Sequence, residues 1–323
     1  MNDAVPTGRY APSPTGSLHL GNLRTALAAY CSAKSRGMRF QLRIEDIDEG
    51  RCKPEFIRQQ LDDLEKIGLI WDAAPIKQSD RTKQYEELFT KLKDRRLVYP
   101  CFCSRKDILE AASAPNAEPA AVEPDGARYP GTCAAHPYDD LIARASGGER
   151  HSWRLRVDQA PQSFFDGFSG ERAIDLRALG GDFVVKRADG LFAYQFACAA
   201  DDMESGVTEV LRGADLLESG ARQAYLIACL GGAAPRYLHI PLLYSATGER
   251  LAKRVGSEDL TGFLARGFDI TAIISYLAHT LGLANPGERI TLDEMVSRWD
   301  MNKMPRADVR VDDNVMNSFK VAA

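Results

Sequence analysis

The sequence predicts an α/β protein built around a parallel sheet with helical crossovers. Three observations lead to this fold class. Segments of strand period and helix period alternate through the first hundred residues, the alternation stops near Tyr99, and helical spacing dominates the last sixty residues. A chain of 323 residues is long enough for about two domains, or for one large α/β unit with an insert.

The first hundred residues are expected to contain two strands and three helices in alternation. Strands are predicted over residues 8–12 and 39–44. Apolar residues at helical spacing predict helices over residues 20–37, 54–68 and about 85–92. This order of elements is typical of parallel strands joined by helices.

The second half of the chain is expected to change from strands to helices. Residues 153–196 are strand-like, and Asp189-Gly190 predicts a hairpin turn between strands over 183–186 and 191–196. Helical patterns return after Asp202 and continue through the last sixty residues.

Composition excludes several classes of protein. Hydrophobic residues make up 45% and charged residues 27%, so the chain can form a sizeable core and is not predominantly disordered. The net charge of −4 excludes a wholly basic coat for nucleic acid, although a local basic face remains possible. The first residues lack a secretory pattern, residues 270–284 are too short and polar to span a bilayer, and seven unevenly spaced cysteines do not suggest a disulfide scaffold. We therefore expect a cytoplasmic protein without a membrane partner.

The segment from Gly8 to Asn22 carries the strongest sign of chemistry. Prolines and small polar residues lead from a predicted strand into a helix that starts near Leu20, and the N-terminus of a helix suits phosphate. His19 can donate a hydrogen bond to a phosphate oxygen there, and Gly21 leaves room for a base or ribose. The alternative is an ordinary strand–turn–helix with a satisfied histidine.

Three cysteines suggest a zinc site. Cys101, Cys103 and Cys133 are soft ligands that suit tetrahedral zinc, which would stabilise a small insert with little core of its own. His136 would be the usual fourth ligand. Residues 110–126, rich in alanine, proline and glutamate, are expected to form a flexible surface excursion between the two halves of the site. The alternative is a set of buried, reduced cysteines.

The segment His19-Leu20-Gly21-Asn22 resembles the first signature of the class I aminoacyl-tRNA synthetases, in the form used by the glutamyl branch. Asn22 departs from the second histidine of that signature. Further segments match the same branch in the same order, and the resemblance extends from about Thr7 to Lys253. These segments cover residues 43–46, 99–105, 189–195 and 210–217, followed by the pair Arg222-Gln223.

The resemblance implies a Rossmann-type catalytic fold and a binding site for L-glutamate. In the family, the positions of Arg9, Ser13, Glu45, Tyr194 and Arg212 bind the amino acid. Glu45 can hold the ammonium group, the two arginines can each take a carboxylate, and Tyr194 adds a hydroxyl. Such a site rejects glutamine, whose amide would leave a buried charge unpaired. Taken singly, each of these charged residues would more often be a solvated surface group.

The resemblance also implies an ATP site with two catalytic residues, His19 and Lys253. Arg250-Leu251-Ala252-Lys253-Arg254 stands where the family has Lys-Met-Ser-Lys-Ser, and Lys253 would stabilise charge on the leaving pyrophosphate. Ala252 replaces the serine, and the alternative is a charged turn on a solvated loop. With magnesium bound to the ATP, the expected contacts are Pro12, Thr15, His19, Gly21, Asn22, Arg250 and Lys253.

For the zinc site, the resemblance favours a different fourth ligand. The short members of the family carry Tyr-Pro-Gly-x-Cys, which occurs here as Tyr129-Pro130-Gly131-Thr132-Cys133. Tyr129 would then complete the set with Cys101 and Cys103, while His136 remains the alternative on general chemistry.

The length suggests which members of the branch the chain resembles. About seventy residues follow Lys253, too few for a two-part anticodon-binding domain, so we expect no such domain. The chain is similar in this respect to the truncated paralogues, the glutamyl-queuosine tRNA(Asp) synthetases, which activate glutamate without tRNA and attach it to queuosine in the anticodon of tRNA(Asp). The expected domains are a first catalytic half (1–98), a zinc-bearing α+β insert (99–190), a second catalytic half (191–258) and a short helical region (259–323).

The expected partners are ATP, L-glutamate and queuosine-containing tRNA(Asp), bound by a monomer. RNA would contact a local basic face, for which the candidates are Arg24, Lys91, Lys93, Arg95 and Arg96; a solvated helix end is the alternative. Two rival functions stay open: a conventional tRNA(Glu) synthetase unit, and a catalytically silent paralogue that only binds RNA or protein.

Overall fold

The computed structural model describes residues 5–112, 129–157, 162–249, 251 and 259–320. A seven-stranded sheet lies at its centre, and every neighbouring pair in it is parallel except β6 and β7. This confirms the predicted α/β class. In spatial order the strands are β3 (Ile76–Lys77), β2 (Arg39–Ile44), β1 (Thr7–Tyr10), β9 (Glu209–Gly213), β10 (Arg236–Ile240), β6 (Gln162–Asp166) and β7 (Gly170–Ile174).

The central strands of the sheet are buried on both faces. Their side chains point alternately to the two faces, and each face packs in its own hydrophobic cluster. In β9, Val210 packs with one hydrophobic cluster and Leu211 with the other; Tyr237 and Leu238 divide in the same way in β10. The first cluster includes α1 (Leu20–Lys34) and the C-terminal helices, and the second includes three helices on the other side of the sheet. Those three are α3 (Thr82–Asp94), α6 (Tyr194–Glu204) and α7 (Leu217–Leu230).

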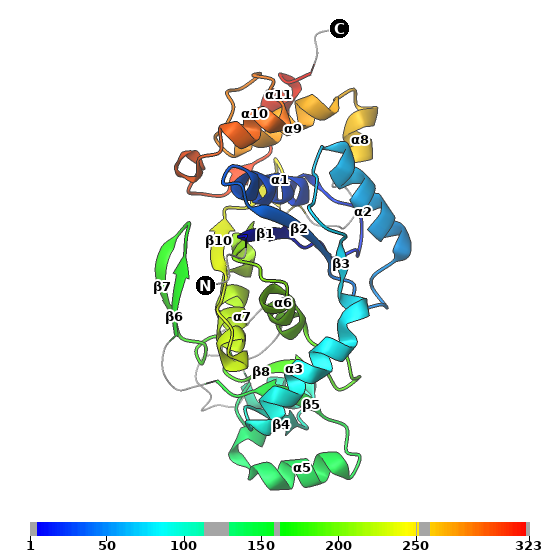
Figure 1. Ribbon diagram of the computed structural model, residues 1–323, viewed down its shortest axis with the longest axis vertical. Coiled ribbons are helices and arrows are strands. Elements are labelled where there is room, and N and C mark those ends of the chain that lie inside the picture. The colour runs from blue at the N-terminus through cyan, green and yellow to red at the C-terminus, as the bar shows by residue number, and fades with distance from the viewer. Residues whose placement is uncertain (1–4, 113–128, 158–161, 250, 252–258, 321–323) are drawn as a thin grey trace.

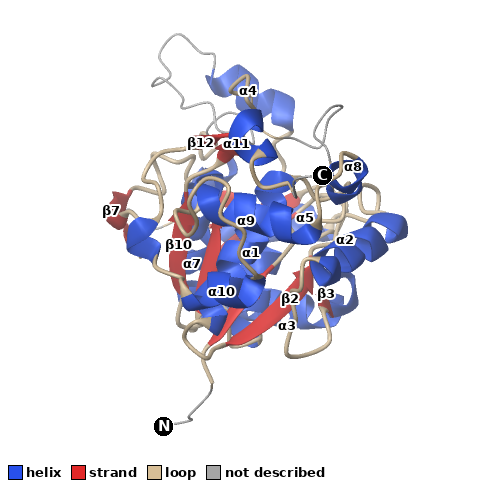
Figure 2. Ribbon diagram, turned by 90° about the horizontal axis from the view of Figure 1, so that it is seen from above, coloured by secondary structure: helices blue, strands red, loops and turns tan. Residues whose placement is uncertain are grey.

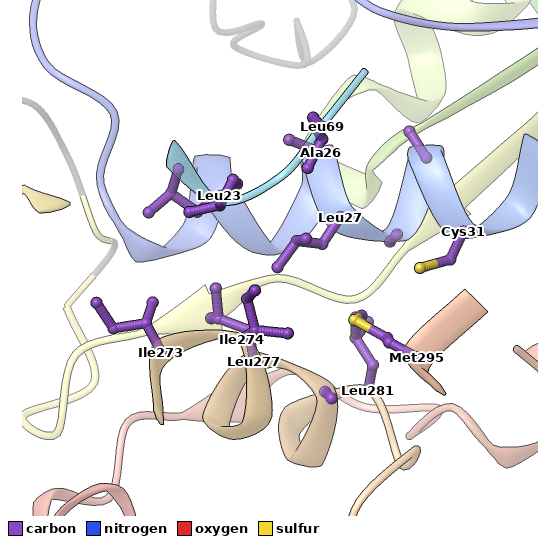
Figure 3. Packing of buried hydrophobic residues seen from close by; sticks show 14 of the residues in the cluster. Leu23, Ala26, Leu27, Cys31, Leu69, Ile273, Ile274, Leu277, Leu281 and Met295 are labelled. Atoms are coloured by element: carbon purple, nitrogen blue, oxygen red, sulfur yellow. The ribbon is translucent and has the colours of Figure 1, made fainter. Parts of the chain in front are cut away.

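The C-terminal helices cover α1 (Figures 1 and 2). Leu23 and Leu27 of α1 face Ile273 and Leu277 of α9 across an apolar contact (Figure 3). Four helices form this region: α8 (Leu260–Ala265), α9 (Ile270–Thr280), α10 (Leu292–Ser297) and α11 (Asp313–Asn317). The expected helical character of the last sixty residues is confirmed, with one small parallel pair of strands, β11 (Leu243–Tyr244) and β12 (Val309–Arg310), tying the region back.

Arg24 lies inside this contact, which makes its assignment to a basic RNA face wrong. Its guanidinium donates to the Thr280 hydroxyl at 3.0 Å, the Thr280 carbonyl at 3.2 Å and the Pro241 carbonyl at 2.6 Å. Only 1% of the residue is exposed. The Arg24 side chain, which the sequence analysis placed on an exposed face, instead joins α1 to α9.

A separate antiparallel sheet lies at the opposite end of the molecule from the C-terminal helices (Figure 1). It orders β4 (Val98–Cys101), β5 (Ser152–Leu155) and β8 (Phe183–Lys186), and α5 (Tyr138–Ser146) packs on β4. Helices α2 (Pro54–Lys66) and α4 (Arg105–Ala112) and four short 3-10 helices complete the described elements. The 3-10 helices are Gln78–Arg81, Cys133–Ala135, Ala214–Leu216 and Met301–Lys303.

The hairpin predicted around Asp189-Gly190 is only half correct. The turn is present, with Gly190 at φ 92°, and β8 precedes it. The second strand is wrong: a single bridge joins Lys186 to Phe192, and α6 begins at Tyr194. The aromatic residues that favour a strand pack instead into the core between α3, α6 and α7, where tertiary contacts outweigh strand propensity.

The predicted domain boundaries stay a prediction. One fact bears on them: the hairpin of β6 and β7 lies within residues 99–190 yet pairs with β10 of the central sheet. Among the described residues, none of the helices has the length and apolar character needed to cross a membrane.

Candidate active site

A cavity of about 340 Å³ opens where β1 and β9 end and α1 begins. Most of the residues that the sequence analysis assigned to glutamate and ATP line this cavity together. They are Arg9, Pro12, Ser13, His19, Gly21, Asn22, Glu45, Tyr194 and Arg212. Thr15 is not among the lining residues. A larger cavity of about 560 Å³ lies beside the start of β10 and the end of α1, and it contains none of the assigned groups.

His19 caps the helix that points into the cavity. Its Nδ1 accepts hydrogen bonds from the backbone N–H groups of Gly21 at 3.1 Å and Asn22 at 3.3 Å, and Asn22 Oδ1 accepts from the His19 N–H. This reciprocal pattern is a capping box. Because Nδ1 is the acceptor, the proton of the neutral ring sits on Nε2, which makes Nε2 a donor.

Gly21 lies close against the ring that forms the cap. A Cβ at this position would lie 3.1 Å from both Cε1 and Nδ1 of the His19 ring. The expected reason for the glycine was room for a base or ribose; the contact in the structure is with the histidine ring itself.

Glu45 is held at the floor of the cavity by three donors. Ser13 Oγ donates to its Oε2 at 3.3 Å, and Oε1 accepts from Arg43 Nη2 at 3.2 Å and from Cys198 Sγ at 3.0 Å. The carboxylate is buried and lines the cavity beside Ser13. A fixed buried carboxylate in this position suits a ligand's ammonium group.

Arg9 is already paired when the cavity is empty. Its Nε and Nη2 each donate to the Asp202 carboxylate at 3.2 Å, and Arg43 binds the same carboxylate. Burial alone would raise the pKa of Asp202, but the two arginines, Arg43 and Arg9, have the larger combined effect and lower it to about 2. The Arg9 donors that Asp202 does not use are those of Nη1 and the second hydrogen of Nη2.

Asp202 and its neighbour Asp201 were not found from the sequence. Asp201 accepts from Gln78, Arg81 and Tyr85, so the two acids together anchor α6 beneath the cavity. The only signal for them is two adjacent acids on a helix whose other residues are largely apolar, a pattern that usually indicates paired buried charges.

Tyr194 and Arg212 complete the wall. Tyr194 is the first residue of α6 and is 37% exposed. Arg212 is a buried residue near the end of β9, and it donates to His239, Gln223 and the Leu216 carbonyl.

The three cysteines expected to bind metal do come together. The sulfur atoms of Cys101, Cys103 and Cys133 all lie within 4.8 Å of one another. Tyr129 lies beside them: its hydroxyl is 3.6 Å from Cys101 Sγ and accepts from the Cys133 N–H at 2.8 Å. His136 is solvent-exposed and does not belong to this group.

The second signature lies outside the described residues. Arg250, Ala252 and Lys253 all fall there, so their expected contacts with ATP stay a prediction. Leu251 is described, and it lines the same cavity as His19 and Gly21.

Comparison with known families identifies the family of the chain. The model of the family described as tRNA synthetases class I (E and Q), catalytic domain, matches residues 5–318. The chain belongs to this family of class I tRNA synthetases.

Relatives of this synthetase extend along most of its length. The glutamyl-Q tRNA(Asp) synthetase of Symbiobacterium thermophilum is 40% identical over 312 residues, which is 94% of this chain and 95% of the relative. That of Rhodopirellula baltica is 41% identical over 319 residues, covering 94% and 96%. Among solved structures, the glutamate-tRNA synthetase of Elizabethkingia anophelis has a TM-score of 0.84 and 27% identity, covering 98% of this chain and 70% of that one.

As a class I tRNA synthetase, the protein is a ligase of the aminoacyl-tRNA type. Its first signature is the capped start of α1, and the segment beginning at Tyr194 supplies both the tyrosine and the acids under Arg9.

Proposed function

We propose that this synthetase activates L-glutamate with ATP, without tRNA, and transfers it to queuosine in the anticodon of tRNA(Asp). The observation that carries the proposal is one cavity that presents a carboxylate, two arginines, a tyrosine hydroxyl and a helix N-terminus to the same space. The names of the relatives supply the acceptor. We expect a cytoplasmic monomer.

The first step joins glutamate to AMP. An oxygen of the α-carboxylate attacks the α-phosphorus of magnesium-bound ATP, and the bond from that phosphorus to the bridging oxygen of pyrophosphate breaks. Glutamyl-adenylate and pyrophosphate result, so no covalent enzyme intermediate is needed. Acceleration comes from holding the two substrates in line and from stabilising the developing charge.

His19 and α1 provide that stabilisation. The cap leaves His19 Nε2–H as a donor at the start of α1, whose dipole also favours phosphate. We assign Lys253 to the leaving pyrophosphate on the family resemblance. Pro12, Thr15, Gly21, Asn22 and Arg250 are the further assigned ATP contacts.

Glutamate is held by opposite charges. Glu45 takes the ammonium group, Arg9 and Arg212 take the carboxylates, and Ser13 and Tyr194 add hydroxyl contacts. Glutamine would turn amide N–H groups toward an arginine and leave that charge unpaired, which costs about 1–3 kcal/mol or more.

A structural zinc is part of the proposal. Cys101, Cys103 and Cys133 form a thiolate set that suits zinc, and Tyr129 is the fourth ligand because its hydroxyl adjoins Cys101 whereas His136 is exposed. When bound, the metal would fasten the segment around Cys133 to β4. It takes no part in the reaction.

The RNA face is assigned to the end of α3. Lys91, Arg95 and Arg96 are exposed there, and Lys93 lies 5.0 Å from the centre of the Trp153 ring. A cationic surface next to an aromatic side chain suits a single-stranded RNA loop.

One labelling experiment separates the proposal from its rivals. Enzyme, ATP and labelled glutamate are incubated with queuosine-containing tRNA(Asp), or with tRNA(Glu), and the RNA is digested with nuclease. Label on the wobble nucleoside of tRNA(Asp) is expected. Label on the 3′-terminal adenosine of tRNA(Glu) would establish the conventional synthetase, and no glutamate-dependent pyrophosphate exchange at all would establish the silent paralogue.

A further inference from the structure

Arg212 differs from the other buried arginines of the site in what it binds. Its Nε donates to His239 Nε2 at 3.0 Å, its Nη1 to Gln223 Oε1 at 2.8 Å and its Nη2 to the Leu216 carbonyl at 3.2 Å. By contrast, Arg9 and Arg43 both bind Asp202. Arg212 is therefore oriented by uncharged acceptors, provided that the His239 ring is neutral, and its positive charge stays available to a ligand.

The His239 ring is held in one tautomer by Asp166. Asp166 Oδ2 lies 2.7 Å from His239 Nδ1 and accepts from the His239 backbone N–H at 3.0 Å. An arginine Nε–H can only donate, so His239 Nε2 must accept, and the ring proton sits on Nδ1, facing the carboxylate. Burial lowers the pKa of His239, the hydrogen bond with Asp166 raises it, and the nearby Arg212 lowers it; the net shift is downward, which favours the neutral ring.

Asp166 is itself fixed. Its Oδ1 accepts from the N–H groups of Phe168 and Ser169 and from the Ser169 hydroxyl, at the turn between β6 and β7. Neither Asp166 nor His239 lines the cavity. The space is also tight, because a Cβ on Gly220 would lie 2.8 Å from the His239 ring and 3.3 Å from Arg212 Nη2.

We propose that Asp166 and His239 are positioning residues that aim the Arg212 guanidinium at the glutamate carboxylate. The relay runs from the β6–β7 turn through His239 on β10 to Arg212 on β9, across three strands of the central sheet. An acidic partner would orient Arg212 equally well but would cancel the charge that selects glutamate. A neutral histidine orients Arg212 without cancelling its charge, because the Asp166 carboxylate that fixes the tautomer lies on the other side of the imidazole ring.

Two substitutions of His239 separate the two ends of the relay. His239→Asn retains a donor near Nδ1 for Asp166 but removes the acceptor for Arg212; His239→Gln places its amide oxygen near Nε2 and retains that acceptor. Asp166→Asn removes the carboxylate that fixes the tautomer, so that the ring proton can occupy Nε2, where it faces Arg212. Kinetics are measured by glutamate-dependent ATP–pyrophosphate exchange, with thermal unfolding of each variant alongside.

The expected result is selective for glutamate. His239→Asn and Asp166→Asn raise the glutamate KM by about tenfold or more, the effect of misplacing one charge-assisted bond, and leave the ATP KM within about twofold. His239→Gln restores the glutamate KM to within about threefold of wild type. As a control, Ser275→Ala changes a residue that is as buried as His239 but does not line the cavity; it lowers the melting temperature and leaves the glutamate KM unchanged.

A second measurement does not depend on any variant folding. In long-range ¹H–¹⁵N spectra of the wild-type protein, His239 is expected to carry its proton on Nδ1, and a proton on Nε2 overturns the inference. So do unchanged glutamate KM values in both His239→Asn and Asp166→Asn, or equal increases for glutamate and ATP. The inference rests on the proposed function, which fails separately if the wild-type enzyme shows no glutamate-dependent exchange.

Discussion

Arg9 and Arg43 share one buried carboxylate, Asp202, and this pairing changes what each residue contributes. Arg43 also pairs with Asp201 and with Glu45, so the cations and anions beneath the cavity are linked to one another. The glutamate site is thus part of a continuous charged network, in which removing one member leaves others unpaired.

Arg9→Ala is expected to weaken glutamate binding by about 2–4 kcal/mol, because a ligand carboxylate would lose its buried partner. The measurement is the glutamate KM in pyrophosphate exchange. Arg51→Ala serves as the matched control, since Arg51 is an exposed arginine on the surface. Equal kinetics for Arg9→Ala and Arg51→Ala would remove Arg9 from the site.

Asp202 should make the folded state sensitive to acid. Its pKa is about 2 in the fold, below its ordinary value near 3.8, so the folded state binds its proton less readily than the unfolded chain. The resulting stability, on the order of 2 kcal/mol, is complete above about pH 4 and is lost as the pH falls toward 2. Urea unfolding at pH 7 and pH 3 measures it, and the same pH dependence in Asp202→Asn would contradict the assignment.

At the scale of elements, α1 joins the N-terminal part of the chain to the C-terminal helices. Its N-terminus carries the His19 cap, and its second turn holds Arg24 against Thr280 of α9 and the Pro241 carbonyl. Burial lowers the pKa of Arg24 to about 10, so it remains charged at neutral pH inside an apolar contact.

Arg24→Ala is expected to lower the free energy of unfolding by about 1–3 kcal/mol, because the Pro241 and Thr280 carbonyls lose their donor. It should leave RNA affinity unchanged, in contrast to Lys91→Ala at the exposed end of α3. Denaturant unfolding and a tRNA binding titration are run on both variants. A weaker RNA complex with intact stability in Arg24→Ala would contradict the structural role.

The antiparallel sheet around β4 should depend on metal. Purified protein is expected to contain about one zinc per chain, and Cys103→Ser should lose it and loosen this region before the central sheet. Cys229→Ser, which changes a cysteine outside the cluster, is the control. In Tyr129→Phe, zinc retained at full affinity would count against the tyrosine as a ligand, and wild-type protein without zinc would count against the site.

Local patterns were enough to predict β1, α1, β2, α2, α3 and β8; β2, α2 and α3 show the period of their class, and Pro54 and Gly68 mark the ends of α2. They failed at α6, where Phe196 favours a strand but packs as part of a helix in the cluster with α3 and α7, and Tyr194 lines the cavity. Sequence reasoning missed the residues Asp166, Asp202 and His239. Their contacts with Arg9, Arg43 and Arg212 or with one another span 27 to 193 positions, and no local period reports such contacts. Arg24 was misplaced for the same reason, since its partner is 256 residues away.

The whole molecule has a net charge of −4, so RNA must be attracted locally. Lys91→Ala combined with Lys93→Ala is expected to weaken tRNA binding and to reduce the slope of log affinity against log salt by about 1 per lost phosphate contact. Glutamate-dependent exchange without RNA should not change. An unaltered salt slope would place the RNA face elsewhere on the surface.

The order of strands also bears on how the chain is made. β1 lies between β2 and β9, and Gly8 pairs with Glu209. A ribosome adding about 5–20 residues per second therefore leaves one edge of β1 without its partner for roughly 10–40 s. Such an open strand invites pairing with other chains. We expect nascent chains halted after residue 98 to sediment as aggregates, whereas chains halted after the last residue of β10 has left the exit tunnel should remain dispersed.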